Sequence, residues 1–268
     1  MSSMLTEFTS WYDAYVDTFR ATDGSLPAMM QLKRAHTERV VANAQEIADG
    51  EGFDAATREA ALIAALLHDT GRYEQLKRYN TFRDSESVDH AVFSHDIVVE
   101  KGWLDGGAAE EEQGEGGSWK AAVLKAILYH NRRELPEGLD AQTEALAHTV
   151  RDADKLDIFR VLEDRVQNTD WRKDTRAFWN LEIVAAPSSV VVEAIAERRP
   201  VDYQNIRTLA DFVLIQVGWM MHELHFAASR RLCVERGHLA FRRAFLHQLT
   251  DDPAVDRLCA LAEKGLRA

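Results

Sequence analysis

The stretch AALIAALLHD, residues 60–69, joins eight consecutive apolar residues to a histidine and an aspartate. This run suits a buried helix and is far shorter than the 18 or more residues of a membrane span. The pattern predicts a helix over Ala55–Asp69, capped by Asp54. His68 and Asp69 then lie at the end of a buried helix, where an unpaired carboxylate would be strongly destabilising. Asp69 therefore needs a cation, strong hydrogen-bond donors, or a solvated position at the helix end.

Helical spacing of apolar residues continues along most of the chain, and Gly, Pro, Ser or Asp interrupt it about every 15 to 25 residues. The segment Ile183–Val192 alone is rich in β-branched residues and has strand-like character. The predicted fold class is therefore all-α. No Pro/Gly/Ser-rich linker divides the chain, so residues 1–268 are expected to form a single domain.

The composition is that of a globular protein able to bury a sizeable core, with 46% hydrophobic and 28% charged residues. The net charge of −12 disfavours a long nucleic acid or an anionic membrane as the main partner, because both would be repelled. It does not exclude a small anion bound at a local site. The glycine-rich, acidic segment Asp105–Gly117 is expected to be a mobile loop, with an acidic docking segment as the alternative.

Two further features bear on the cellular setting. The first 19 residues contain no Lys or Arg, unlike the basic start of a secretory signal, so a cytoplasmic location is expected. The two cysteines, Cys233 and Cys259, are too few for a disulfide framework and are expected to be reduced core residues.

Four other predicted helices place a histidine or an aspartate in line with their apolar residues. They are Ala28–Ala48 with His36, Ser87–Lys101 with His90 and His95, Ser118–His130 with His130, and the helix from Ala141 with Asp154. A single histidine on an apolar face is usually a hydrogen-bonded core residue, so each one alone is weak evidence. Asp154 is less easily explained, because Val150 and Ile158 lie one turn to either side of it.

His90 and His95 compete for one position in this set. Five residues correspond to about 140° around a helix of 3.6 residues per turn, so both cannot point at the same place. Taken together, the helices direct six ligand-type residues at one core: His36, His68, Asp69, His90 or His95, His130 and Asp154. Such a set suits one or two divalent ions of Fe, Mn, Ni, Co or Zn, with Mg as a further candidate, and suits Ca poorly. Asp69 is placed to bridge two ions.

The order His36, then His68-Asp69, then a distant Asp154 resembles the HD-domain superfamily of metal-dependent phosphohydrolases. The resemblance covers about residues 30–160, and HDTGR and RDADKLD are its most specific segments. It implies a helical-bundle core over about 30–160, extended by further helices over about 161–268. The C-terminal helices carry a Met and aromatic stripe that suits a core or an interface, so a homodimer is a candidate assembly.

Dinuclear members of this superfamily have two more histidines, which His90 and His130 resemble. The third histidine of those members opens a His-Ala pair and is followed four positions later by a small residue. His90 with Ser94 fits this pattern and His95 does not, so the resemblance selects His90 as the ligand. The chain differs from well-known subfamilies in lacking an HD-GYP signature and in having Ser94 instead of glycine.

The segment GRYEQLKRYNTFRD, residues 71–84, has four basic and two acidic residues and follows the HD pair as a predicted basic loop. Phosphoryl chemistry needs positive charge on the outer phosphate oxygens. The residues expected to bind phosphate are Arg72 and Arg83, then Asn131, Arg132 and Arg133. The residues expected to act in catalysis are Asp69, Arg72, Glu74 and Lys155. The alternative for the basic side chains is a solvated surface without a ligand.

The resemblance implies a metal-dependent phosphohydrolase that cleaves a phosphate ester or anhydride by attack of metal-activated water. A small phosphorylated substrate is expected, with nucleotides as the leading class. The same ligand pattern also resembles the di-iron oxygenases built on this fold, which keeps C–H oxidation open. The third alternative is a catalytically silent protein of this fold that binds a nucleotide or a partner, although silent versions should have lost ligands.

Overall fold

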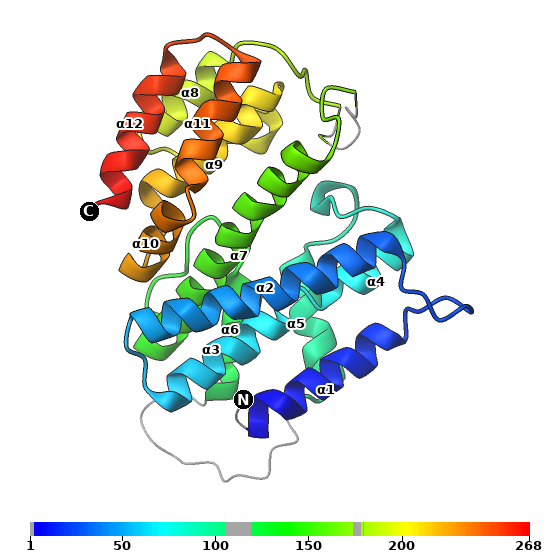
Figure 1. Cartoon of the computed structure of the whole chain (residues 1–268). Coiled ribbons are helices and arrows are strands. Elements are labelled where there is room, and N and C mark those ends of the chain that lie inside the picture. The colour runs from blue at the N-terminus through cyan, green and yellow to red at the C-terminus, as the bar shows by residue number, and fades with distance from the viewer. Residues whose placement is uncertain (1–2, 105–118, 174–177, 179) are drawn as a thin grey trace. The chain divides into compact units, whose positions relative to one another are not determined.

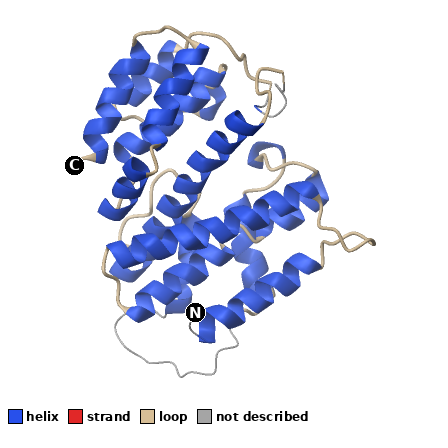
Figure 2. Ribbon diagram, viewed as in Figure 1, coloured by secondary structure: helices blue, strands red, loops and turns tan. Residues whose placement is uncertain are grey.

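The structure is a computed structural model that describes residues 3–104, 119–173, 178 and 180–268 (Figure 1). Within these residues the fold is all-α, as predicted, and the β-pairing is limited to an isolated bridge between Glu182 and Thr208 (Figure 2). The expected acidic loop, Asp105–Gly117, lies outside the described residues. The chain divides into two compact units, Met1–Asp154 and Lys155–Ala268, and helix α7 (Ala141–Asn168) runs through the boundary. The single domain expected from the sequence stays a prediction.

The first unit is built around α3, which contains the apolar stretch that opens the sequence pattern. Every residue from Ala60 to Leu67 is buried, and α1, α2 and α6 pack against this helix (Figure 1). The helices and the short 3-10 helix η1 have the following bounds: α1 Ser3–Asp17, α2 Ala28–Gly50, α3 Ala55–Leu67, α4 Gly71–Tyr79, η1 Asp84–Glu86, α5 His90–Glu100 and α6 Trp119–Tyr129. Burial on all faces explains why α3 has no polar residue from Ala60 to Leu67.

Two aspartates determine where helices of this unit begin. Asp54 accepts hydrogen bonds from the backbone of residues 56 and 57, so α3 starts where the sequence predicts. Asp89 accepts from residues 91 and 92 in the same way, so α5 starts at His90 and not at Ser87. The predicted start at Ser87 was therefore wrong by three residues, because the Asp89 cap sets the start of the helix.

The segment after the HD pair is also more ordered than expected. Residues 71–79 form α4, where a basic loop was predicted, and Asn80 ends this helix with a positive φ of 53°. Gly71 packs directly against α5: a Cβ atom at this position would lie 2.7 Å from the backbone nitrogen of Ser94. The Gly71 N–H also donates to the Ser94 hydroxyl at 2.9 Å. A glycine is therefore required where α4 meets α5.

The second unit packs around α9, with α8, α11 and α12 against it. The bounds of its elements are α8 Ser189–Ala196, η3 Tyr203–Asn205, α9 Leu209–His222, α10 Ala227–Glu235, α11 His238–Leu249 and α12 Ala254–Leu266. The segment Ile183–Val192 is helical from Ser189, so its strand-like pattern is misleading. The buried carboxylate of Asp211 accepts from the backbone and hydroxyl of Ser188, which orients the start of α8.

A buried ionic network stabilises this unit. Arg242 is fully buried and donates to the Glu163 carboxylate at 2.6 Å, to the Gln216 side chain and to two backbone carbonyls. His238 contacts the same Glu163 oxygen at 2.7 Å. Cys233 and Cys259 are buried and free, as expected. Among the described residues no helix combines the length and apolar character needed to cross a membrane.

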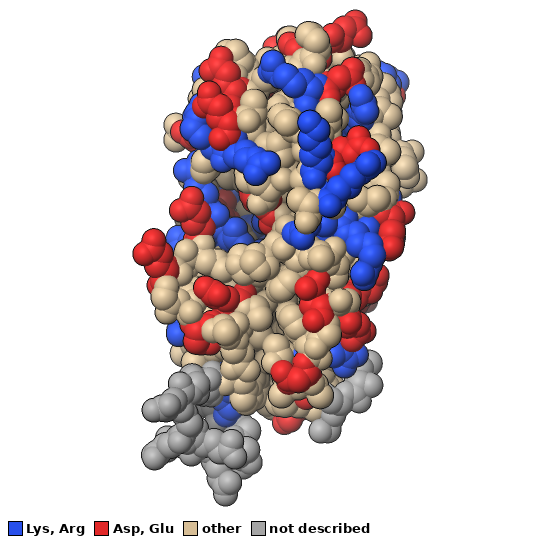
Figure 3. All heavy atoms as spheres, turned by 90° about the vertical axis from the view of Figure 1, so that its left-hand side faces the viewer, with Lys and Arg blue, Asp and Glu red and all other residues tan. Residues whose placement is uncertain are grey.

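Charge is unevenly distributed along the sequence. Residues 1–154 carry 15 basic and 28 acidic side chains, whereas residues 155–268 carry 17 basic and 16 acidic ones. Acidic and basic groups are interspersed over the face shown in Figure 3. The net charge of −12 therefore belongs to the first unit, and any anion bound there depends on cations placed locally.

Candidate metal centre

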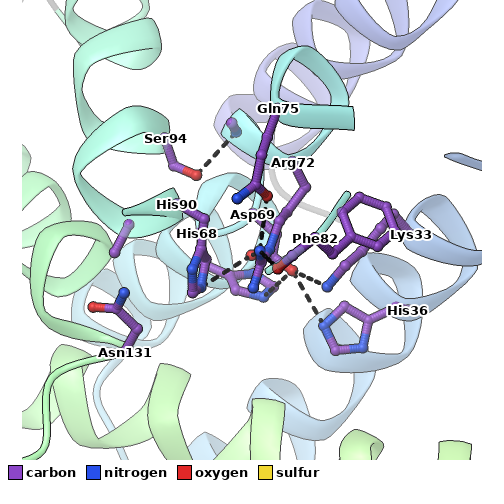
Figure 4. A network of polar contacts seen from close by, with 12 residues as sticks. Lys33, His36, His68, Asp69, Arg72, Gln75, Phe82, His90, Ser94 and Asn131 are labelled. Atoms are coloured by element: carbon purple, nitrogen blue, oxygen red, sulfur yellow. Dashed lines mark hydrogen bonds and ion pairs between the residues drawn. The ribbon is translucent and has the colours of Figure 1, made fainter. Parts of the chain in front are cut away.

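All six predicted ligand residues lie in one cluster of the first unit. Their positions are His36 in α2, His68 and Asp69 just after α3, His90 at the start of α5, His130 just after α6, and Asp154 in α7. Five of the six are buried and Asp154 is partly exposed. Helix ends bring most of them together, because a chain that has just left a helix can turn a side chain inward (Figure 4).

The Asp69 carboxylate lies at the centre, and its two oxygens face different histidines. Oδ2 is 3.5 Å from Nε2 of both His36 and His68. Oδ1 is 3.7 Å from Nε2 of His90 and 3.8 Å from Nε2 of His130. The carboxylate thus separates the four imidazoles into two pairs.

Asp154 belongs to the first pair only. Its Oδ1 is 3.1 Å from Nε2 of His36 and 4.0 Å from Nε2 of His68. Burial alone would raise the pKa of the Asp154 carboxyl, but the hydrogen bond from His36 and the nearby imidazoles lower it below the usual range. Asp154 is therefore an anion, as a metal ligand must be.

The other ring nitrogen of two of these histidines is engaged by a backbone carbonyl. Nδ1 of His68 lies 2.7 Å from the Ala65 carbonyl, and Nδ1 of His130 lies 2.7 Å from the Ile127 carbonyl. A carbonyl oxygen only accepts, so in both rings the proton is on Nδ1 and the Nε2 lone pair faces the cluster. Burial lowers the pKa of both imidazoles, and His90 beside it lowers that of His130 further, so both rings are neutral near pH 7.

These donor atoms fit a cation better than they fit one another. Nε2 of His68 and Oδ1 of Asp69 are buried and have no hydrogen-bond partner within the part of the chain that the structure describes. Nε2 of His90 and Nε2 of His130 face each other at 3.0 Å, so either a proton or a metal cation must lie between these two nitrogens. Imidazole nitrogens and carboxylate oxygens are the ligands of divalent transition metals. The chemistry of the site is therefore that of a metal centre.

Sequence reasoning missed Lys33, whose ammonium group donates to Oδ2 of Asp69. Lys33 lies one helical turn before His36, so its spacing on α2 was a usable signal. Arg72 approaches the other oxygen, with Nε 3.5 Å from Oδ1. Burial alone would raise the pKa of Asp69, but Lys33, His68 and Arg72 together hold it well below the usual value. The Phe82 ring has Lys33 and Arg72 each 5.7 Å from its centre (Figure 4).

The other expected phosphate contacts have partners elsewhere. Arg83 pairs with Glu86 at 2.6 Å, on the surface. Asn131 donates to Asp89 at 2.8 Å, and Arg132 lies 3.4 Å from the same carboxylate. Three of these expected phosphate contacts therefore already have acidic partners, while Arg133 is exposed.

The remaining candidates differ in their surroundings. Glu74 pairs with Arg78 at 2.7 Å on the face of α4. Lys155 lies 3.4 Å from Glu223 and 5.8 Å from the centre of the Trp219 ring. His95 contacts Asp96 at 3.0 Å, and its side chain is 28% exposed, so of the two competing histidines it is His90 that joins the cluster.

The comparison with known families agrees with the residues that form the cluster. Residues 34–158 match the family model of the HD domain. The chain contains an HD domain. The match spans every residue of the cluster from His36 to Asp154 and agrees with the expected extent of about 30–160. No curated protein and no solved structure gives a significant match to the chain, so the comparisons assign no substrate to this HD domain.

Proposed function

We propose that this HD domain is a metal-dependent phosphohydrolase that cleaves a phosphate ester or anhydride of a small phosphorylated substrate, with nucleotides as the leading class. One observation carries the proposal: the two oxygens of Asp69 face two separate histidine pairs. A carboxylate shared by two ligand sets is the arrangement expected of a two-metal hydrolytic site. The HD-domain family generally includes metal-dependent phosphohydrolases, which supports the same reaction class.

The distances from the Asp69 oxygens divide the proposed ligands into two sets. One divalent ion is held by His36, His68, Asp69 and Asp154, and a second by Asp69, His90 and His130. Mn, Fe, Co, Ni and Zn suit these nitrogen and oxygen donors, and Mg is a further candidate. When bound, such a pair supplies Lewis acidity and lowers the pKa of water.

Two cations of the chain itself border this site. The Arg72 guanidinium is fixed, because Nη1 donates to the Phe82 carbonyl at 2.7 Å and to Asp84 at 3.0 Å. Lys33 has a flexible stem, is 19% exposed and has Asp69 as its anionic partner. Lys33 is therefore the group that can turn from Asp69 to a phosphate oxygen, while Arg72 contributes a fixed positive charge.

Metal analysis of the purified protein followed by a phosphate-release screen over nucleotides tests this proposal. The wild-type chain should contain divalent metal and release phosphate from at least one substrate, and Asp69→Ala should do neither. A wild-type protein without metal and without turnover would rule the proposal out. Oxygen uptake by protein loaded anaerobically with iron, without phosphate release, would favour the oxygenase alternative instead.

A pair of histidine variants checks the ligand assignment. His90→Ala should lower the metal content, whereas His95→Ala, five residues along the same helix, should leave it unchanged. The reverse result would assign the ligand to His95. Because His90 is buried and His95 is partly exposed, thermal melts of both metal-free variants are needed to show that a lower metal content reflects a lost ligand and not a lost fold.

A further inference from the structure

Asp84 is not among the six candidate ligands, yet it contacts one of them directly. Its Oδ2 lies 2.5 Å from Nδ1 of His90, on the side of the ring opposite to Asp69. Its Oδ1 accepts from Nη1 of Arg72 at 3.0 Å and from the side-chain amide of Gln75 at 3.1 Å. Both oxygens of Asp84 are therefore used within the protein.

The segment that carries Asp84 is firmly attached to α4. Gln75 is fully buried, and its amide donates to the Ser87 hydroxyl at 2.8 Å and to the Val88 carbonyl at 3.2 Å. Arg72 holds the Phe82 carbonyl at 2.7 Å. Arg72 and Gln75 of α4 thus hold residues 82–88 on both sides of Asp84. These contacts keep the Asp84 carboxylate next to His90.

Asp84, Asp89 and His90 could be taken for a separate metal site, because one atom from each lies within 4.8 Å of the others. The carboxylate of Asp89, however, caps α5 and also accepts from Asn131 at 2.8 Å. The Asp84 carboxylate already has three donors. Asp89 is therefore a helix cap and Asp84 is the partner of His90. Neither carboxylate is left unused to bind a metal ion.

The two halves of the metal centre differ in charge. The half with His36 and His68 has Asp154 as a carboxylate of its own. Among the described residues, the half with His90 and His130 has the shared Asp69 as the one carboxylate that faces both Nε2 atoms. A divalent ion in this half would be bound by two neutral imidazoles and by an Asp69 carboxylate whose charge is shared with the other half. A further anion hydrogen-bonded to one of these imidazoles would add negative charge to the site.

We propose that Asp84 is a positioning residue that sets the affinity of the second metal ion. Its carboxylate keeps the proton of His90 on Nδ1, turns Nε2 toward the cluster and makes that nitrogen a stronger donor. This inference rests on the two-metal site of the proposed function. It is specific to one half, because His68 and His130 direct Nδ1 to neutral carbonyls.

The test compares Asp84→Asn with Glu86→Gln, which removes an exposed acid from the same 3-10 helix. Each protein is loaded with Mn²⁺, separated from free metal and analysed for ions bound per chain, and the second ion is titrated. Wild type and Glu86→Gln should bind two ions. Asp84→Asn should retain one and bind the second about 10- to 100-fold more weakly, the usual effect of losing a carboxylate partner of a ligating histidine.

A second measurement needs no substitution and so does not depend on the variant's folding. In ¹⁵N imidazole spectra of wild-type protein loaded with Zn²⁺, His90 should carry its proton on Nδ1. A proton on Nε2, or an Asp84→Asn protein that binds its second ion within twofold of wild type, would overturn the role of Asp84. A wild-type protein that binds fewer than two ions would instead overturn the two-metal site and this inference with it.

Discussion

Replacing Lys33 by methionine tests how the metal-free protein neutralises Asp69. The side chains of this pair are 19% and 4% exposed, so the ion pair is largely buried. Removing one partner of a fully buried pair costs about 3 to 5 kcal/mol. Water still reaches Lys33, and Arg72 remains 3.5 Å from the other Asp69 oxygen. We therefore expect Lys33→Met to lower the stability of the metal-free protein by about 2 kcal/mol, after discounting for solvent.

A metal ion on Asp69 should remove this cost, because the ion takes over the neutralising role of Lys33. Thermodynamic linkage then requires the variant to bind that ion more tightly by the same free energy. A difference of about 2 kcal/mol corresponds to about 30-fold in the dissociation constant. Loss of stability without metal and gain of metal affinity are thus two measurements of one quantity.

Urea denaturation in EDTA and in excess Mn²⁺, together with a metal titration, provides the assay. The control is Arg34→Met, which removes the neighbouring basic residue from a half-exposed pair with Asp13 at 2.9 Å. This control should change neither the metal affinity nor the difference between the two denaturation curves. Equal destabilisation of Lys33→Met with and without metal, or an unchanged metal affinity, would refute the argument that Lys33 and a metal ion compete for Asp69.

Three further predictions concern stability. Arg242→Ala should cost about 3 kcal/mol in urea denaturation, because it removes a fully buried side chain and leaves the largely buried Glu163 carboxylate without its arginine, whereas Arg243→Ala, in a surface pair of equal length, should have little effect. Gly71→Ala should cost about 1 to 3 kcal/mol and reduce the metal content, since its Cβ would meet the α5 backbone at 2.7 Å; unchanged values would contradict this close packing. Because burial lowers the pKa values of His68 and His130 below their unfolded value of about 6.5, the unfolded chain takes up more protons in acid. Metal-free protein should therefore lose stability from pH 7 to pH 5, by at most about 1.4 kcal/mol per pH unit and histidine, and a flat profile in thermal melts would count against neutral buried rings.

The sequence predicted those parts of the fold that depend on local periodicity. An apolar run that ends in His68 and Asp69 requires a buried helix, and Asp54 caps that helix as expected. The same logic placed His36 and Asp154 on inward-facing positions. Local pattern succeeded here because the 3.6-residue repeat alone decides which side of a helix is buried.

The phosphate contacts could not be predicted in this way, because net charge does not show which groups pair. The segment 71–84 has an excess of basic residues, yet Arg78 pairs with Glu74 and Arg83 with Glu86. Lys33, which does approach Asp69, is 36 positions away from it in the sequence. Such contacts depend on how helices pack, and a count of charges in one segment does not contain that information.

The division into two units was hidden from the sequence for a related reason. A boundary between parts of a chain is usually read from a linker, and here the boundary between the two compact units falls inside α7, between Asp154 and Lys155. The local composition does not change at a boundary that lies within a helix. The balance of charge does differ between the two parts of the chain, with 28 acidic side chains in residues 1–154 and 16 in residues 155–268.

Burial lowers the pKa of a histidine ligand and raises that of an aspartate ligand. Nearby cations offset this effect for Asp69. Burial lowers the pKa of His68 and His130, which keeps these imidazoles neutral and able to bind metal. The same burial would protonate Asp69, and Lys33 together with Arg72 prevents this. Four of the candidate ligands, His68, His130, Asp69 and Asp154, therefore present lone pairs near pH 7 before any ion arrives. These four ligands need to lose no protons when a metal binds, whereas Lys33 must leave Asp69 and the proton that His36 donates to Asp154 must leave Nε2.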